Sequence, residues 1–176
     1  FDQDSIEISK NYWIDTGMWK CGNGGVMRTG ACGCFFFWDE KKVIEISKQF
    51  CKCTHYDPRC VFSSVLISLI ISRLIQWRCG MIEVFDLDKT ISDVKAIFQR
   101  QDGEDEEETE TIADFSEIDQ FLYAQNIDDL GVIDGTVPIT LVTMGCAIYA
   151  LRKDLSYEKG IETIIRAGGD TDTNAA

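Results

Sequence analysis

The sequence predicts an all-α fold. Its apolar residues recur at helical spacing, no stretch alternates apolar and polar residues as a half-buried strand would, and no internal repeat is present. With 176 residues, of which 45% are hydrophobic and 27% charged, the chain is long enough to form one domain with a buried core. We therefore expect a single domain over residues 1–176, with an acidic loop at about 100–130.

The first half of the chain predicts a packed start, a glycine turn and two helices. Residues 1–20 show no clear period, and their aromatic side chains indicate a packed loop or a short helix. The glycine-rich residues 22–25 are a turn signal, and a helix follows over about 26–37. Asp39 is a suitable N-cap for a second helix that ends near Cys53. We expect the inner side of that helix to carry Val43, Ile44, Ile46 and Phe50.

The most apolar run, Val61 to Trp77, predicts a central helix that Asp57 caps and Pro58 opens, and that ends near Gly80. The run is 17 residues long and contains four serines and an arginine. That length is at the lower edge of what crosses a bilayer. We therefore expect a buried core helix and no membrane association.

Two further helices are expected near the C-terminus. A helical pattern covers about 139–152, and Ser156 is a suitable N-cap for another helix over about 157–167. The pair Gly168–Gly169 ends that helix, because glycine accepts the left-handed conformation that follows a helix. Residues 170–176 then indicate a loop that enters a further helix.

The charge of the chain is uneven. Its 17 basic and 30 acidic residues give a net charge of −13, which argues against a broad surface for nucleic acid or anionic membrane. Ten of the acids and no base lie between Asp102 and Asp119. Self-repulsion should keep this segment solvated as a loop, and a role for it in protein interaction stays open.

Eight cysteines lie in apolar, helix-like stretches, where a free thiol behaves as a small hydrophobic group. This favours reduced cysteines and a cytoplasmic protein over a disulfide-bonded secreted one. A zinc site is a weaker alternative, because the spacing of its candidate ligands is unusual and the first two would point about 200° apart on a helix. Those candidates are Cys51, Cys53, His55 and Cys60.

The C-terminal loop offers oxygen ligands. Asp170, Asp172 and Thr173 place two carboxylates and a hydroxyl within four residues, and such donors suit hard cations such as Mg²⁺. The alternative is that Asp170 or Asp172 only caps the next helix, and on spacing alone this is the commoner outcome.

Two other loops could contact an anionic ligand. The glycine turn places bare amides at a helix N-terminus, where they can hold a phosphate, and Arg28 could add a charge-assisted bond. The alternative is an ordinary turn. His55, the only histidine, lies between two helices and could touch a ligand or only bond a nearby backbone carbonyl.

The three loops, in this order, resemble the ADP-ribosylglycohydrolase family, which includes dinitrogenase-reductase-activating glycohydrolases and some lens crystallins. The segments are GNGGVMRT at 22–29, THYDPRC at 54–60 and GGDTDTNAA at 168–176. The likeness runs from about Tyr12 to Ala176, except for the acidic segment near 100–130.

The resemblance implies an all-α orthogonal helical bundle with one or two Mg²⁺ or Mn²⁺ ions. It also implies hydrolysis at the anomeric carbon of ADP-ribose attached to protein side chains or small molecules. By the same likeness, the metal ligands are Asp170, Asp172 and Thr173, and the substrate-contacting residues are Asn23, Gly24 and His55. Arg28 and Arg59 would have a supporting role by ion pairing within the fold, and we assign no catalytic base.

The chain departs from the family pattern in three places. The Ser/Thr-Asp-Asp-Thr motif expected upstream of the glycine loop has no counterpart, since Asp15–Thr16 lies too close to Gly22 and lacks the second aspartate. No helix follows Ala176, and the Gly-Tyr-rich segment usual before Pro138 is absent. We therefore expect a partial domain, truncated at both ends, with weak metal binding and low turnover by itself. A catalytically inactive relative that acts as a binding or structural protein is the alternative function.

Overall fold

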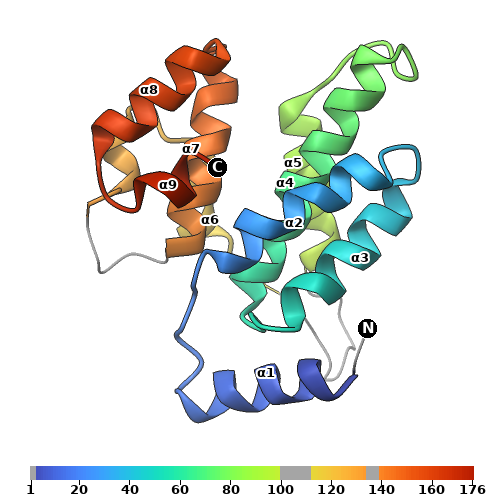
Figure 1. The fold of residues 1–176 in the computed structure, drawn as a ribbon, viewed down its shortest axis with the longest axis vertical. Coiled ribbons are helices and arrows are strands. Elements are labelled where there is room, and N and C mark those ends of the chain that lie inside the picture. The colour runs from blue at the N-terminus through green and yellow to red at the C-terminus, as the bar shows by residue number, and fades with distance from the viewer. Residues whose placement is uncertain (1–2, 100–111, 134–138) are drawn as a thin grey trace.

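A computed structural model of the chain describes residues 3–99, 112–133 and 139–176 (Figure 1). Apart from one isolated β-bridge between Gln99 and Ile112, the regular structure of these residues is helical, which confirms the predicted all-α fold. The elements are α1 (Gln3–Asp15), α2 (Gly24–Phe35), α3 (Glu40–Lys52), α4 (Pro58–Arg78), α5 (Leu87–Phe98), α6 (Ser116–Leu122), the 3₁₀-helix η1 (Ile127–Leu130), α7 (Ile139–Arg152), α8 (Tyr157–Ala167) and α9 (Thr171–Asn174).

Helix α4 is the centre of the fold, as its sequence predicts, and packs against α2, α3, α5 and α7 (Figure 1). Its length and apolarity alone would let it cross a membrane, but 67% of its most apolar stretch is buried inside the molecule. Three of its four serines bond backbone carbonyls through their hydroxyls, as Ser68 does with Thr29 at 2.9 Å and with Ser64 at 2.8 Å. The buried Ser64 hydroxyl has no hydrogen-bond partner among the described residues. The apolar surface of α4 is thus used in the core.

Helices α2 and α4 approach each other unusually closely at Gly33. A Cβ atom at this position would lie 2.2 Å from the carbonyl oxygen of Ser68, which is far inside van der Waals contact. Only glycine can occupy the position without moving one helix. An apolar cleft of about 310 Å³ lies between this helix pair and the pair α7 and α9.

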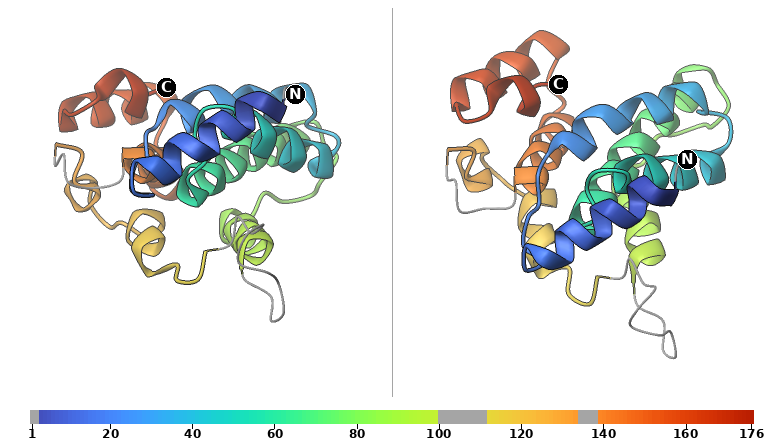
Figure 2. Two further views of the ribbon diagram at one scale, coloured as in Figure 1. Left: turned by 90° about the horizontal axis from the view of Figure 1, so that it is seen from below. Right: turned by 60° about the horizontal axis from the view of Figure 1, so that its bottom comes forward.

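Helix α1 lies across one end of the molecule and contacts α3 (Figures 1 and 2). The sequence left open whether this segment is a loop or a short helix, and the structure shows a helix of 13 residues. It is anchored through the indole of Trp13, whose Nε1 donates to Asp57 Oδ2 at 3.1 Å.

The predicted helix boundaries hold where a capping residue marks them. Asp39 accepts a bond from the Lys42 amide, and Ser156 accepts one from the Lys159 amide. After α8, Gly168 and Gly169 have φ of +87° and +71°, the left-handed region that the sequence predicted. One detail is wrong: Phe50 is 38% exposed, and its ring lies under the Arg28 guanidinium and not in the core.

The expected acidic loop is wrong for its second part. Helix α6 and the 3₁₀-helix η1 lie within it, while residues 100–111 are outside the described part of the chain. Packing explains the difference: Ile118, Phe121 and Leu122 are buried, and α6 packs against α7. Burial of three large side chains outweighs the repulsion of the nearby acids.

Helix α5 was not predicted at all, although the sequence carries its signal. Asp86 caps it by accepting a bond from the Lys89 amide, and Ile91, Val94 and Phe98 recur at helical spacing on its buried face. Its face packs against α4.

The close contact between Gly169 and the Val132 carbonyl can be tested by substitution. A Cβ there would lie 1.9 Å from the Val132 carbonyl oxygen, so Gly169→Ala should lower the free energy of unfolding by about 2 kcal/mol or more. Gly80→Ala is the matched control, because Gly80 has φ of +72° with no atom near its Cβ position and should cost only about 1 kcal/mol. Urea denaturation measures both, and equal losses would mean that the contact with Val132 is absent.

Candidate functional site

The glycine loop is held by a side chain that leaves the helix amides uncapped. Asn23 occupies the N-cap position of α2, but its side chain makes no capping hydrogen bond. Its Nδ2 instead donates to Asp170 Oδ2 at 2.7 Å, across 147 residues of sequence. The first amides of an α-helix have no partner within the helix, and among the described residues no side chain caps those of α2.

The C-terminal acidic loop meets the glycine loop at this contact. Asp170 sits at the N-cap position of α9, yet its side chain does not cap the helix, so the capping interpretation of Asp170 is wrong. The Asn23 amide donates to the Asp170 carboxylate and, together with the neighbouring Asp172 and Thr173 side chains, lowers its pKa. Two carboxylates and a hydroxyl therefore converge, as the sequence suggested.

A threonine of α7 completes this polar cluster. Thr143 Oγ1 lies 3.4 Å from Asn23 Nδ2 and donates to Asn174 Oδ1 at 2.8 Å. Asn174 is buried, so this bond fixes the last turn of the chain against α7. Sequence reasoning missed Thr143; its only signal was a hydroxyl within a very apolar helix.

His55 packs against the glycine loop from the other side. Cβ atoms at Gly22 and Gly24 would lie 3.2 Å from its Nε2 and 3.1 Å from its Cε1, which explains why small residues occupy both positions. Its Nδ1 lies 2.7 Å from the Thr54 hydroxyl, and not beside a backbone carbonyl as one interpretation expected. Burial, and then the positive charge of Arg28, lower the pKa of His55, so the imidazole is neutral at pH 7.

A cavity of about 190 Å³ opens beside His55. Aromatic rings and one lysine dominate its wall, which gives it flat apolar surfaces and a single positive charge. The lining residues are Ser9, Tyr12, Trp13, Lys20, Gly22, Thr54, His55 and Tyr56.

Comparison with known proteins decides the family. The model of the ADP-ribosylglycohydrolase family matches residues 4–176, nearly the whole chain. The chain belongs to this family. No curated protein and no solved structure matches it. Membership in the ADP-ribosylglycohydrolase family points to hydrolysis of ADP-ribose linkages, and members of the family typically depend on a metal.

The C-terminal cluster fits the hard cation that an ADP-ribosylglycohydrolase would use. Its donors are the carboxylates of Asp170 and Asp172 and the hydroxyl of Thr173, which are the oxygen ligands that Mg²⁺ and Mn²⁺ prefer. The two aspartates are exposed and Thr173 is buried, so the cluster opens to solvent on one side.

The two arginines of the family motifs support the fold. Arg28 donates to the carbonyls of Phe50 and Cys51 and to the Thr54 hydroxyl, so it stabilises the end of α3 through carbonyls and not through the expected ion pair. Arg59 does form ion pairs, with Asp57 at 2.9 Å and with Glu117 at 3.3 Å.

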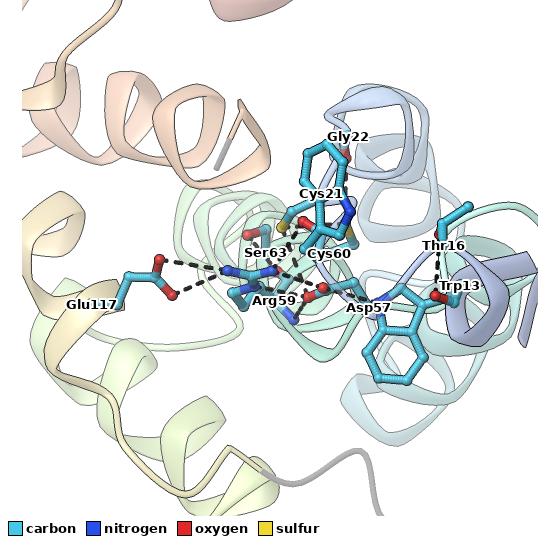
Figure 3. Close-up of polar contacts among 10 residues, drawn as sticks. Trp13, Thr16, Cys21, Gly22, Asp57, Arg59, Cys60, Ser63 and Glu117 are labelled. Atoms are coloured by element: carbon cyan, nitrogen blue, oxygen red, sulfur yellow. Dashed lines mark hydrogen bonds and ion pairs between the residues drawn. The ribbon is translucent and has the colours of Figure 1, made fainter. Parts of the chain in front are cut away.

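Asp57 is the best-satisfied carboxylate near the site (Figure 3). It is buried, with 2% of its surface exposed. Its oxygens accept from the Arg59 amide at 2.8 Å, from Arg59 Nε at 3.0 Å, from Arg59 Nη2 at 2.9 Å and from Trp13 Nε1 at 3.1 Å. The carboxylate thus joins α1 to the start of α4.

The zinc alternative is wrong in its ligand set. None of the eight cysteines forms a disulfide. Cys51 Sγ donates to the His55 carbonyl and Cys53 Sγ to the Gln49 carbonyl, so these thiols do not converge with the imidazole. Within residues 3–99, 112–133 and 139–176, the one group of three potential ligands in mutual reach is Cys21, Asp57 and Cys60. Its two sulfur atoms make it a poor site for Mg²⁺.

The lone histidine provides a direct test of the site's electrostatics. Because burial and Arg28 lower the pKa of His55 below 6.5, the folded chain binds fewer protons than the unfolded chain as the pH falls below 6.5. Stability attributed to His55 should therefore be complete above that pH and decline below it. In a proton NMR titration, the ring C–H resonances of this one histidine should shift with a midpoint pH below 6.5. A midpoint pH at or above 6.5 would place the ring in solvent or beside an anion.

Proposed function

We propose that this chain hydrolyses the glycosidic bond of ADP-ribose attached to protein side chains or to small molecules, with one or two Mg²⁺ or Mn²⁺ ions. The observation that carries the proposal is the 2.7 Å contact between Asn23 and Asp170. It joins a loop with free amides, suited to an anion, to a carboxylate cluster suited to a cation. ADP-ribose, with its diphosphate and its two ribose rings, requires both.

The diphosphate is assigned to the start of α2. Amides that point out of a helix N-terminus bind phosphate oxygens, and the helix dipole favours the negative charge. Gly24 is the first residue of α2, and the absence of a side chain there lets its backbone lie directly against the His55 ring. Neutral His55 packs against the same loop and can donate a hydrogen bond through one ring nitrogen.

The metal-binding role is assigned to Asp170, Asp172 and Thr173. When bound there, a divalent ion would polarise ribose hydroxyls or the leaving group and orient a water molecule. The contact from Asn23 lowers the pKa of Asp170, so the carboxylate is ionised and ready to bind a cation throughout the neutral range.

The reaction itself needs charge stabilisation at the sugar. The bond between the anomeric carbon and the leaving atom breaks, a water oxygen bonds to that carbon, and the proton of the water passes to the leaving group. Positive charge develops on the ribose in an oxocarbenium-like transition state. Fixed carboxylates near this carbon stabilise that charge. We assign no catalytic base among the described residues.

The same proposal covers the organisation and location of the protein. We treat residues 4–176 as one ADP-ribosylglycohydrolase-like domain, for which the extent of the family match is the support. A cytoplasmic location is proposed because none of the eight cysteines forms a disulfide, as is usual for the reduced thiols of that compartment. ADP-ribosylated proteins or small molecules are the proposed partners.

Removing either carboxylate should weaken metal binding. Asp170→Asn and Asp172→Asn should each lower the affinity for Mg²⁺ by about tenfold or more and abolish most release of ADP-ribose. Asp128→Asn is the control, because Asp128 is an exposed aspartate in η1, outside the cluster. Isothermal titration calorimetry with Mg²⁺ and chromatography of released ADP-ribose give the two readouts. Undiminished Mg²⁺ binding in both variants would remove these residues from the ligand set. If the unaltered chain binds ADP-ribose but releases none from a substrate, the alternative function, an inactive binding protein, is favoured.

Asn23 should matter for both halves of the site. Asn23→Ala removes the donor to Asp170, so the affinity for ADP-ribose should fall by about tenfold and the pKa of Asp170 should rise. Asn11→Ala, an exposed asparagine on α1, is the matched control. Fluorescence competition with a labelled ADP-ribose measures the affinity. An unchanged affinity would mean that the glycine loop does not contribute to ADP-ribose binding.

A further inference from the structure

Two cysteines form a buried dithiol directly before the glycine loop. Cys21 Sγ and Cys60 Sγ lie 3.7 Å apart, although the residues are separated by 39 positions (Figure 3). Cys21 has 8% of its surface exposed and Cys60 has none. Among the described cysteines this is the one sulfur pair within hydrogen-bond distance.

The surrounding contacts hold the two thiols together. Cys60 lies in the first turn of α4, and its Sγ also lies 3.3 Å from the Gly22 carbonyl oxygen. The carbonyl of Cys21 accepts a bond from the Thr140 amide at 3.2 Å, which ties its backbone to the start of α7. Cys21 itself lies between α1 and α2, outside any helix.

A metal ion bound by these thiols and Asp57 is disfavoured by the hydrogen bonds of the carboxylate. Both oxygens of Asp57 already accept N–H groups of Arg59, and one also accepts the Trp13 indole. An ion would have to displace the guanidinium from a buried carboxylate, which is costly. The remaining reaction for the two thiols is bond formation between their sulfur atoms.

We propose that Cys21 and Cys60 are a redox modification site, where hydrogen peroxide forms a reversible disulfide that fixes the glycine loop to the start of α4. One thiolate attacks a peroxide oxygen, giving a sulfenic acid and, after proton transfer, one water. The second thiol sulfur then displaces hydroxide from the sulfenic sulfur, and its proton completes the second water. The two sulfurs lose two electrons, and the peroxide gains them. A dithiol reductant reverses the reaction by thiol–disulfide exchange.

The geometry requires a short movement. A disulfide has an S–S bond of about 2.05 Å, so the sulfurs must approach by somewhat less than 2 Å from their 3.7 Å separation. The disulfide has no thiol proton, so the Gly22 carbonyl loses its hydrogen bond from Cys60. The new S–S bond restrains the neighbouring residue, Cys21, instead. Because the hydrogen bond shared with Cys60, burial and the negative charge of Asp57 raise the pKa of the Cys21 thiol, oxidation should be slow.

The sequence makes the product easy to identify. Trypsin cleaves after Lys20 and Arg59, so Cys21 and Cys60 become the first residues of the peptides 21–28 and 60–73, each with a single cysteine. The folded chain is treated with hydrogen peroxide, its remaining thiols are blocked, and the digest is examined by mass spectrometry without reduction. The expected product is one species in which these two peptides are joined, lost on treatment with dithiothreitol.

Variants separate this site from the other thiols. A chain with Cys34→Ser, Cys53→Ser and Cys79→Ser lacks the thiols with the most solvent access and should still form the linked peptides. Cys146→Ser, which removes a buried thiol of α7, should also keep them, whereas Cys21→Ser and Cys60→Ser should each lose them. The oxidised three-serine chain should melt about 5 °C or more above its reduced form, because the cross-link restricts the unfolded chain.

Two results would overturn the proposal. In the first, the three-serine chain is folded, as circular dichroism shows, and is treated with peroxide, yet peptides 21–28 and 60–73 are not joined. The other is a link that pairs Cys60 with Cys51 or Cys32. Since the mapping is made on the unaltered chain as well, a variant that fails to fold does not decide the outcome.

Discussion

The buried carboxylate of Asp57 is the constraint on which the site depends. A charge with 2% exposure is tolerable only when its hydrogen bonds are complete, and Arg59 and Trp13 supply them. Through Arg59 the pair also reaches Glu117 on α6. The start of α4, helix α1 and the segment before the glycine loop therefore share one anchor. His55, two residues earlier, takes its place against the glycine loop from the same junction.

The candidate site is formed by segments that are distant in the sequence and that helix α7 holds close together. Helix α7 bonds Cys21, just before the glycine loop, through the Thr140 amide, and it bonds the loop itself through Thr143. Thr143 also bonds Asn174 at the end of the chain. Helix α7 thereby places a helix start without a side-chain cap next to a carboxylate cluster. Under the proposed function, the diphosphate of ADP-ribose lies at this helix start, and the sugar carbon that becomes positive lies near the carboxylates.

The sequence predicted elements whose ends carry a chemical signal. Asp39, Asp57 and Ser156 cap helices as expected, because an N-cap depends on one side chain and its near neighbours. Helix α6 was hidden because charge dominated its composition, while its three buried side chains act only once α7 is beside them. The residue types of the proposed metal and phosphate loops could be predicted. The contact from Asn23 to Asp170, the contacts of Thr143 and the Cys21–Cys60 pair depend on tertiary distances and could not.

The close approach at Gly33 has a mechanical consequence. Helices α2 and α4 meet backbone to backbone there, so sliding one past the other would drive Gly33 into the Ser68 carbonyl, and the two must move as one rigid unit. By contrast, α9 faces that unit across an apolar cleft, whereas α7 packs directly against α4 and bonds the segment around the glycine loop through polar side chains and one amide. Hinge motion that opens this cleft would therefore displace α9 and the carboxylate loop before it, while the start of α2 stays fixed.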